Sequence, residues 1–396
     1  MNVSDSPAQA DFRAQVRAWI ASDVPPHLKG QRQGIVQGPG IGPEDHRLLE
    51  AALARRGWLA PAYPKEVGGG GLAPDELLIF WEELFSAGVP YLEQSALIHF
   101  CQTLLHVGTP YQKEKFLRPT LEGRIIWSQG SSEPNAGSDL ASLQTRAEVV
   151  EGGFRVTGQK IWTSHAHEAD YLFMQVRTDP TAPRKWDGIS MLIVDARSPG
   201  ITVRPIQTID DHHHFNETFY DDVFVPAENL VGELHKGWAL VKYNLGFERF
   251  FHNVTEPTRI RRGLENFRDA ARGTPGPGGT AWDDPELKRR AAALAMQADC
   301  FRYTRYRAVT RFARGEKPGN ETMFFKFVGG ELWQDIVGAH HEALGPAGLA
   351  WDDEPFGHEV AEAARHAANI RAATIRGGTA EIQRNIVAKR VLGLPE

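Results

Sequence analysis

Hydrophobic positions at helical spacing mark the first third of the chain. Apolar residues recur every three or four positions within 12–20, 48–53, 77–85 and 97–105. Residues at this spacing line one face of an α-helix. Loops rich in glycine and proline separate the segments. The pattern therefore predicts an α-helical N-terminal domain over residues 1–122.

The hydrophobic pattern changes to a period of two in the middle domain, over residues 123–232. Thr145–Val150 and Phe154–Thr157 alternate on either side of a Glu-Gly-Gly turn and predict a β-hairpin. Further strands are predicted at Tyr171–Arg177, Ile189–Val194, Ile201–Pro205 and Glu217–Val225. Several short strands separated by turns are typical of a small barrel or sandwich.

Helical periodicity returns in the last domain, residues 233–396. Long amphipathic segments joined by short connections are predicted at 236–272, 285–314, 321–344 and 357–376. Such an arrangement indicates a C-terminal four-helix bundle. Near its end, Gly377 and Gly378 predict a break between two helices, and Thr379 is predicted to cap the second one, with Glu381 in its first turn. The domain order indicates the fold but not the chemistry.

Composition excludes several function classes. The net charge is −6, and basic residues alternate with acidic ones, which argues against nucleic-acid binding. The N-terminal segment lacks the features of a signal peptide, and no apolar run is long enough for a membrane span, so a cytoplasmic location is expected. Two cysteines provide no disulfide framework.

Three adjacent histidines, 212–214, follow two aspartates. Their spacing is not that of a structural zinc site, and successive side chains in extended backbone point in different directions. We expect this loop to contribute to a site or an interface, and we predict no metal ion.

Two polar segments of the middle domain contain the candidate chemistry. Trp127–Asp139 concentrates hydroxyl and amide groups beside a turn, which suits a polar heterocycle and phosphates. Gly158–Ser164 places Trp162 next to hydroxyl groups, where an indole can stack on a planar ligand. Each segment alone is also typical of an ordinary turn or of core packing.

Together, three motifs resemble those of the acyl-CoA dehydrogenase family. They are Ser132–Asp139 (S-E-P-N-A-G-S-D), Lys160–Ser164 (K-I-W-T-S) and Gly378–Arg384 (G-T-A-E-I-Q-R). The resemblance covers nearly the whole chain. It implies a helical N-terminal domain, a middle β-barrel domain, a C-terminal four-helix bundle, and FAD as cofactor.

The resemblance also implies site residues. Gln129, Ser131 and Ser132 are expected to contact the isoalloxazine ring, with Trp162 packed against the ring and Ser164 near its N5 edge.

At the other end of the cofactor, Thr379 and Glu381 are expected to reach the ADP half, where a helix start favours phosphate. Ser138 is expected beside the CoA moiety of an acyl-CoA substrate. Electron-transfer flavoprotein is the implied electron acceptor.

The proton acceptor of the implied reaction is predicted from two further positions of the sequence. The family's reaction takes a proton from the α-carbon of the acyl thioester and needs a carboxylate base. Many members have a glutamate directly before the Gly-Thr pair, where this chain has Gly377, whose backbone N–H remains able to bind the substrate carbonyl. In a subset of the family the glutamate lies on the first bundle helix, before an arginine. Glu248 matches that position and is the predicted base, with Arg249 as a substrate-side cation.

The expected reaction is therefore α,β-dehydrogenation of an acyl-CoA to the trans-2-enoyl-CoA. The R-x-x-F-G segment that helps to bind a neighbouring subunit's FAD in most members is missing at 271–280. The chain is thus expected to be a homo-oligomer or a heteromer with a paralogous subunit. Two alternatives stay open: a subunit that only completes a partner's site, and a flavin monooxygenase on the same fold.

Overall fold

The computed structural model describes residues 4–30, 42–90, 92, 100–314, 316 and 319–395. The chain forms two compact units. The sheet unit comprises residues 53–71 and 93–248, and the helical unit comprises the remainder. Helix α7 (Gly237–Gly273) belongs to the sheet unit up to residue 248 and to the helical unit from residue 249.

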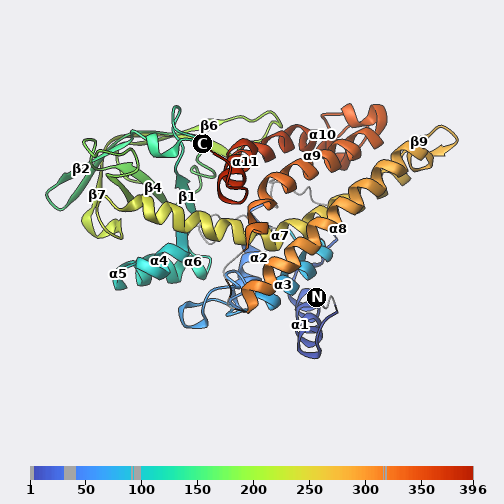
Figure 1. The fold of residues 1–396 in the computed structure, drawn as a ribbon, viewed down its shortest axis with the longest axis horizontal. Coiled ribbons are helices and arrows are strands. Elements are labelled where there is room, and N and C mark those ends of the chain that lie inside the picture. The colour runs from blue at the N-terminus through green and yellow to red at the C-terminus, as the bar shows by residue number, and fades with distance from the viewer. Residues whose placement is uncertain are drawn as a thin grey trace. The chain divides into compact units, whose positions relative to one another are not determined.

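A single sheet of eight strands forms the centre of the sheet unit (Figure 1). The strand order is β6-β7-β3-β2-β4-β5-β8, and β1 pairs in parallel with β4. The strands are β1 (Trp127–Gly130), β2 (Arg146–Val150), β3 (Gly153–Lys160), β4 (Tyr171–Arg177), β5 (Ile189–Asp195), β6 (Ile201–Ile206), β7 (Phe215–Pro226) and β8 (Leu230–Val231).

The strands follow the hydrophobic pattern closely. β2 and β3 form the predicted antiparallel hairpin, with Val150 opposite Gly153. β4 and β5 are almost continuously apolar because nearly all of their residues are buried. The inward residues form one core cluster that includes Val156, Met174 and Leu192. The sheet predicted for the middle of the chain is confirmed.

Short helices complete the sheet unit. They are α4 (Cys101–Val107), α5 (Pro110–Gln112) and α6 (Arg118–Leu121), with a π-helical turn at Lys113–Leu117 between the last two. Buried Phe100 stacks on Phe173 of the sheet with ring centroids 4.7 Å apart. Of the stripe predicted at 97–105, residues 97–99 lie outside the described residues.

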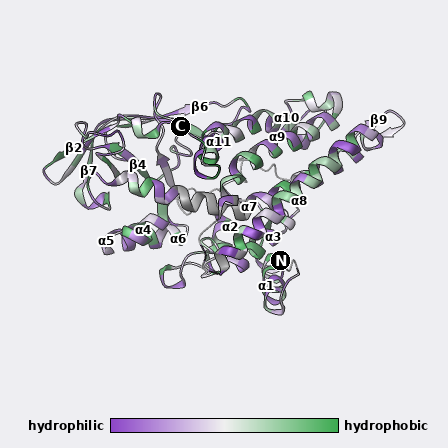
Figure 2. Cartoon of the chain, viewed as in Figure 1, coloured by the Kyte–Doolittle hydropathy of each residue, from purple (hydrophilic) through white to green (hydrophobic). Residues whose placement is uncertain are grey.

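The helical unit is built from amphipathic helices (Figure 2). They are α1 (Pro7–Asp23), most of α2 (Pro43–Ala54), α3 (Pro74–Ser86), the second part of α7, α8 (Pro285–Ala313), α9 (Phe325–Ala343), α10 (His358–Asn369) and α11 (Ala380–Arg390). The strands β9 (Pro275–Gly276) and β10 (Gly279–Thr280) form a small hairpin between α7 and α8. Phe267 of α7, Phe301 of α8 and Trp333 of α9 share one buried core.

These elements confirm the predicted fold class. The predicted bundle segments correspond to α7, α8, α9, and α10 with its 3₁₀ extension Ile370–Thr374. Within the described residues, none of the helices combines the length and the apolarity that crossing a membrane requires.

A buried ion-pair network connects four elements of the helical unit. The Arg305 guanidinium on α8 is 1% exposed. It donates to the Glu82 carboxylate on α3 at 2.7 Å and to the Thr258 hydroxyl on α7 at 2.8 Å. Arg13 on α1 donates to the second oxygen of Glu82 at 3.2 Å. Burial lowers the pKa of Arg305 below its ordinary value, and the Glu82 charge offsets this effect.

Replacing Arg305 by Met is expected to lower the free energy of unfolding by about 3 kcal/mol, the lower end of the range for breaking a buried pair, because the half-buried Glu82 carboxylate and the buried Thr258 hydroxyl both lose their Arg305 donor. Urea unfolding of the variant measures this loss. Arg17→Met is the control: Arg17 is 65% exposed, and its buried partner Glu83 keeps Arg13 as a second partner at 2.7 Å, so its loss is expected to cost less than about 1 kcal/mol. If both variants lost the same free energy of unfolding, burial of Arg305 would not be the reason for its contribution to stability.

Candidate functional site

The hydroxyl-rich turn after β1 is held by side chains of the sheet. The Gln129 amide donates to the Ser131 hydroxyl at 2.9 Å, and that hydroxyl donates to the Gln175 amide oxygen at 2.7 Å. Gln175 lies on β4 and is almost fully buried. The structure therefore brings the predicted residues Gln129 and Ser131 together. The sequence analysis missed Gln175, for which a lone polar residue in an apolar strand is the only signal.

A buried ion pair lies directly behind this turn. The Lys160 ammonium, at the end of β3, donates to the Glu133 carboxylate at 2.9 Å and to the Ser131 carbonyl at 3.1 Å. Glu133 also accepts from the backbone N–H groups of Gln144 at 2.6 Å and Thr145 at 2.9 Å. The pair therefore connects the turn, β3 and the approach to β2.

The pKa values of the pair reflect burial and attraction. Burial lowers the pKa of Lys160 to about 8 although Glu133 stabilises its charge. For Glu133, burial raises the pKa, but the Lys160 charge and the bonds from Thr145 and Gln144 outweigh it, so the net shift is downward. Both groups are therefore ionised at neutral pH.

The segment after β3 displays Trp162. Its backbone is left-handed, with φ of 60°, and its side chain is 53% exposed, with its ring 5.9 Å from that of Phe215 in an edge-on contact. A non-glycine residue in this conformation costs free energy and needs support from its neighbours. One indole face beside hydroxyl groups suits a planar ring such as isoalloxazine.

Hydrogen bonds to β7 and β1 support this segment. Thr163 and Asn216 exchange backbone hydrogen bonds at 3.0 and 3.1 Å, and the Asn216 amide donates to the Thr163 carbonyl at 3.0 Å. The Ser164 carbonyl accepts from the Ser128 hydroxyl at 2.5 Å, so Ser164 is fixed beside β1. The Ser132 carbonyl accepts from the Ile161 N–H at 2.9 Å. Ser132, Trp162 and Ser164 thus lie on connected segments of one unit.

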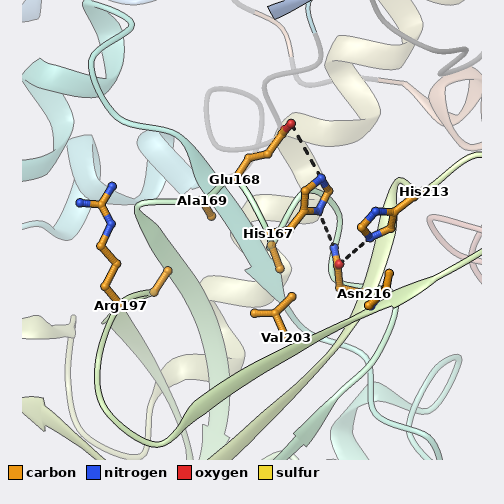
Figure 3. Close-up of a pocket in the computed structure, with 10 residues that line it drawn as sticks. His167, Glu168, Ala169, Arg197, Val203, His213 and Asn216 are labelled. Atoms are coloured by element: carbon orange, nitrogen blue, oxygen red, sulfur yellow. Dashed lines mark hydrogen bonds and ion pairs between the residues drawn. The ribbon is translucent and has the colours of Figure 1, made fainter.

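The histidine-rich loop reaches the same segment. Asn216 bridges two stacked imidazoles: its oxygen lies 2.8 Å from Nε2 of His213, and its amide nitrogen lies 3.2 Å from Nδ1 of His167. The two ring centroids are 4.3 Å apart. Both histidines line a cavity of about 370 Å³ with Arg197 and Val203 (Figure 3). Because the amide donates to His167, the proton of that neutral ring lies on Nε2, toward Glu168.

No group of three or more metal-ligating side chains suited to an ion occurs in the described part of the chain. The His165 backbone N–H donates to the His214 carbonyl at 2.8 Å, which joins the loop to the Trp162 segment. This proximity is consistent with the expectation that the loop contributes to the site.

Ser138, near the end of the Ser132–Asp139 motif, lies in a turn and is exposed. The next residue, Asp139, accepts from the Lys185 ammonium at 2.7 and 2.8 Å.

The remaining predicted residues of the C-terminal motif lie in the helical unit. Gly377 and Gly378 have φ values of 62° and 86°, so the predicted break between helices is confirmed. Thr379 caps α11 by accepting from the Ile382 N–H at 3.2 Å, also as predicted. The pKa of the exposed Glu381 carboxyl is lowered by its own backbone N–H and by the Thr379 hydroxyl. Free N–H groups at a helix start fit a phosphate ligand.

Glu248 and Arg249 lie within α7, but their side chains are outside the described residues. One turn earlier on the helix, Asn244 is buried and hydrogen-bonded to the Thr103 hydroxyl of α4. The predicted roles of Glu248 and Arg249 stay predictions.

Acidification is expected to destabilise the sheet unit through His214. Burial, together with the neighbouring histidines, lowers the pKa of His214 to about 4, and only Asp210 opposes this shift. The unfolded chain, with a histidine pKa near 6.5, binds the proton first. Stability present above pH 6.5 is therefore lost as the pH falls toward 4, by at most about 1.4 kcal/mol per pH unit.

A pH series of thermal unfolding midpoints tests this expectation. His214→Phe, which cannot take up a proton, is expected to flatten the decline between pH 6.5 and 4. His358→Phe replaces an exposed histidine as the control and is expected to follow the wild-type profile. Parallel profiles for wild type and His214→Phe would refute the assignment.

Comparison with known proteins identifies the family. The chain matches the N-terminal, middle and C-terminal domain models of acyl-CoA dehydrogenase at residues 6–124, 128–223 and 235–392. It is 34% identical to the acyl-CoA dehydrogenase IpdE1 of Mycobacterium tuberculosis, over 97% of each chain.

Two similar solved structures are each described by two component names. The Tcur3481-Tcur3483 steroid ACAD is 31% identical with a TM-score of 0.85, and the ChsE4-ChsE5 complex from Mycobacterium tuberculosis is 32% identical with a TM-score of 0.84. Both comparisons cover 100% of each chain. On all three domain models and on full-length similarity, this chain belongs to the acyl-CoA dehydrogenase family.

Proposed function

We propose that the chain catalyses α,β-dehydrogenation of an acyl-CoA thioester to the trans-2-enoyl-CoA, with Glu248 as the base that removes the α-proton. The observation that carries the proposal is that the exposed indole of Trp162 and the Gln129–Ser131 hydrogen-bond chain lie on segments joined by the Ile161–Ser132 and Ser128–Ser164 hydrogen bonds. FAD is the cofactor of this family member, and these residues fit it because they combine a stacking surface with polar groups held in place. When bound, FAD supplies the acceptor for the β-hydride.

The side chains of the protein position the cofactor and the substrate and transfer the proton. Gln129, Ser131 and Ser132 are assigned to the isoalloxazine ring, with Trp162 against the ring and Ser164 near its N5 edge. Thr379 and Glu381 are assigned to the ADP half. All except Thr379 and Glu381 come from the sheet unit.

Substrate binding is assigned to three residues. Ser138 lies beside the CoA moiety, the Gly377 backbone N–H binds the thioester carbonyl, and Arg249 supplies a substrate-side positive charge. Donation to the carbonyl oxygen stabilises the negative charge that develops as the α-proton leaves. Glu248 accepts this proton.

The assignment of Glu248 rests on two observations. Gly377 cannot accept a proton, and α7 is an uninterrupted helix through position 248. A residue on a regular helix has a fixed backbone position, which suits a base that must approach one carbon atom.

Glu248→Gln is expected to slow anaerobic bleaching of the flavin by acyl-CoA by about 10²–10⁴-fold, the range for loss of a general base. Stopped-flow absorbance measures the rate, and the flavin content of the purified variant shows whether binding is intact. Glu265→Gln removes another carboxylate from α7, one that pairs with Arg262, and is expected to bleach at the wild-type rate. A near wild-type rate for Glu248→Gln would assign the base elsewhere.

The same assay separates the reaction from its alternatives. Bleaching by acyl-CoA without oxygen supports the dehydrogenase, and electron-transfer flavoprotein is the proposed acceptor that reoxidises it. A flavin monooxygenase needs oxygen and a supply of reduced flavin. A subunit that only completes a partner's site does not bleach unless the partner is present.

A ring-bearing acyl group is the proposed substrate class, and a heteromer with a paralogous subunit is the proposed assembly. One solved relative is described as a steroid ACAD, and both contain two named components. The absence of the R-x-x-F-G segment at 271–280 is a second argument for a partner that completes cofactor contacts.

The chain expressed alone is therefore expected to contain less than one FAD per protomer, and addition of the paralogous subunit is expected to restore the missing FAD. Light scattering after gel filtration gives the assembly, and the ratio of flavin to protein absorbance gives the FAD content. A homo-oligomer that carries a full complement of FAD would contradict the heteromer.

A further inference from the structure

Lys160 is a fully buried lysine in a position where nothing in the family reaction as proposed needs its charge. Lysine is almost never buried unless it is paired, since its ammonium group loses strong hydration. Here the buried lysine is the last residue of β3, two positions before Trp162. The contacts of the ammonium group indicate why.

The ammonium group and the aliphatic stem of Lys160 both support the turn after β1. A Cβ atom on Gly130, the last residue of β1, would lie 3.0 Å from Cβ of Met174 and 3.6 Å from Cγ of Lys160, so the lysine stem packs close to the start of the turn. The ammonium group donates to the carbonyl of the next residue, Ser131, at 3.1 Å. The last residue of β1 and the first residue of the turn therefore both lie next to the Lys160 side chain.

Glu133 completes the support from the other end of the turn. Its backbone exchanges hydrogen bonds with Ala136, and its carboxylate accepts from Lys160 and from the N–H groups of Gln144 and Thr145. Thr145 comes close because of Gly158, where a Cβ atom would lie 2.7 Å from the Thr145 Cα atom. The ion pair therefore fixes residues 130–136 from both ends.

Arg305 provides a comparison within the same chain. It is equally buried and also paired with a carboxylate, but its partners Glu82 and Thr258 belong to helices of the other unit. The Arg305 pair has the contacts expected of an ion pair that only stabilises the fold. The pair at Lys160 differs because it bonds the backbone of Ser131, one of the residues assigned to the flavin.

We propose that Lys160 is a positioning residue for the flavin: paired with Glu133, it holds the turn at residues 130–136 in the conformation that receives the isoalloxazine ring. This role rests on the proposed function for the flavin contacts. The conformational part, fixation of the turn, is independent of any bound flavin.

Two measurements on Lys160→Met separate these parts. Hydrogen exchange of the protein without flavin is expected to show protection of the Glu133, Ala136, Gln144 and Thr145 amides reduced by about tenfold or more beyond the global loss of stability. Equilibrium dialysis of the protein, together with its partner subunit if one co-purifies, is expected to show FAD binding weakened by about tenfold or more. Arg305→Met is the matched control, with lower global stability but unchanged relative protection and FAD affinity.

The double variant Lys160→Met/Glu133→Gln distinguishes positioning from stability. Removing both charges takes away the unpaired buried carboxylate, so the thermal midpoint is expected to recover partly toward wild type; recovery is incomplete because the new amide has one acceptor oxygen for the N–H groups of Gln144 and Thr145. The turn still lacks the bond to Ser131, so weak protection and weak FAD binding are expected to persist. If Lys160→Met does not fold, hydrogen exchange and FAD binding are measured on the double variant instead.

Recovery of FAD affinity together with stability, or local protection unchanged in Lys160→Met, would overturn the proposal. If wild-type protein binds no FAD even with the paralogous subunit added, but Lys160→Met loses protection at the turn, the conformational role stands and the proposed function fails. If wild type binds FAD and bleaches with acyl-CoA while Lys160→Met binds FAD equally well, the proposed function stands and the positioning role fails.

Discussion

The burial of Lys160 constrains much of the sheet unit. A positive charge without access to water has to be balanced by a carboxylate and surrounded by hydrogen-bond acceptors. Glu133 provides the charge, and the Ser131 carbonyl provides a further acceptor. Glu133 in turn requires donors for its oxygens, which the N–H groups of Gln144 and Thr145 supply. One buried ammonium group thus determines the path of two chain segments far apart in sequence from it.

The Trp162 segment shows a second way of fixing an exposed residue. Its left-handed backbone is unfavourable for tryptophan, so the conformation persists only because hydrogen bonds on both sides compensate. Asn216 provides most of these bonds through its backbone and its amide. A stacking surface that is already oriented loses little conformational entropy when a planar ligand binds. The turn after β1 and the Trp162 segment, the two predicted sites of ring contact, are therefore each held by buried polar groups.

Sequence periodicity was sufficient to predict the elements but not the groups that support the site. β4 and β5 were predictable because a strand buried on both faces is continuously apolar, and Thr379 was predictable because cap residues act through local backbone bonds. The burial of Lys160 was not, since a lysine in an alternating strand normally faces water. The contact between His167 and His213 depends on the pairing of segments 46 residues apart, about which a local pattern carries no information.

Gly377 argues against a base at its own position in two ways: it has no side chain, and its backbone conformation is unfavourable for other residues. Its φ of 62° lies in the left-handed region, where a residue with a Cβ atom costs about 1–2 kcal/mol. Gly378, at 86°, is also left-handed, and a Cβ atom there would lie 2.7 Å from the Gln383 amide nitrogen. This tight turn lets α11 begin directly after its cap residue, Thr379. A glutamate at position 377 would strain the turn on which that helix start depends. A base on the regular backbone of α7 avoids this conflict, because the turn can then keep the glycines that shape it.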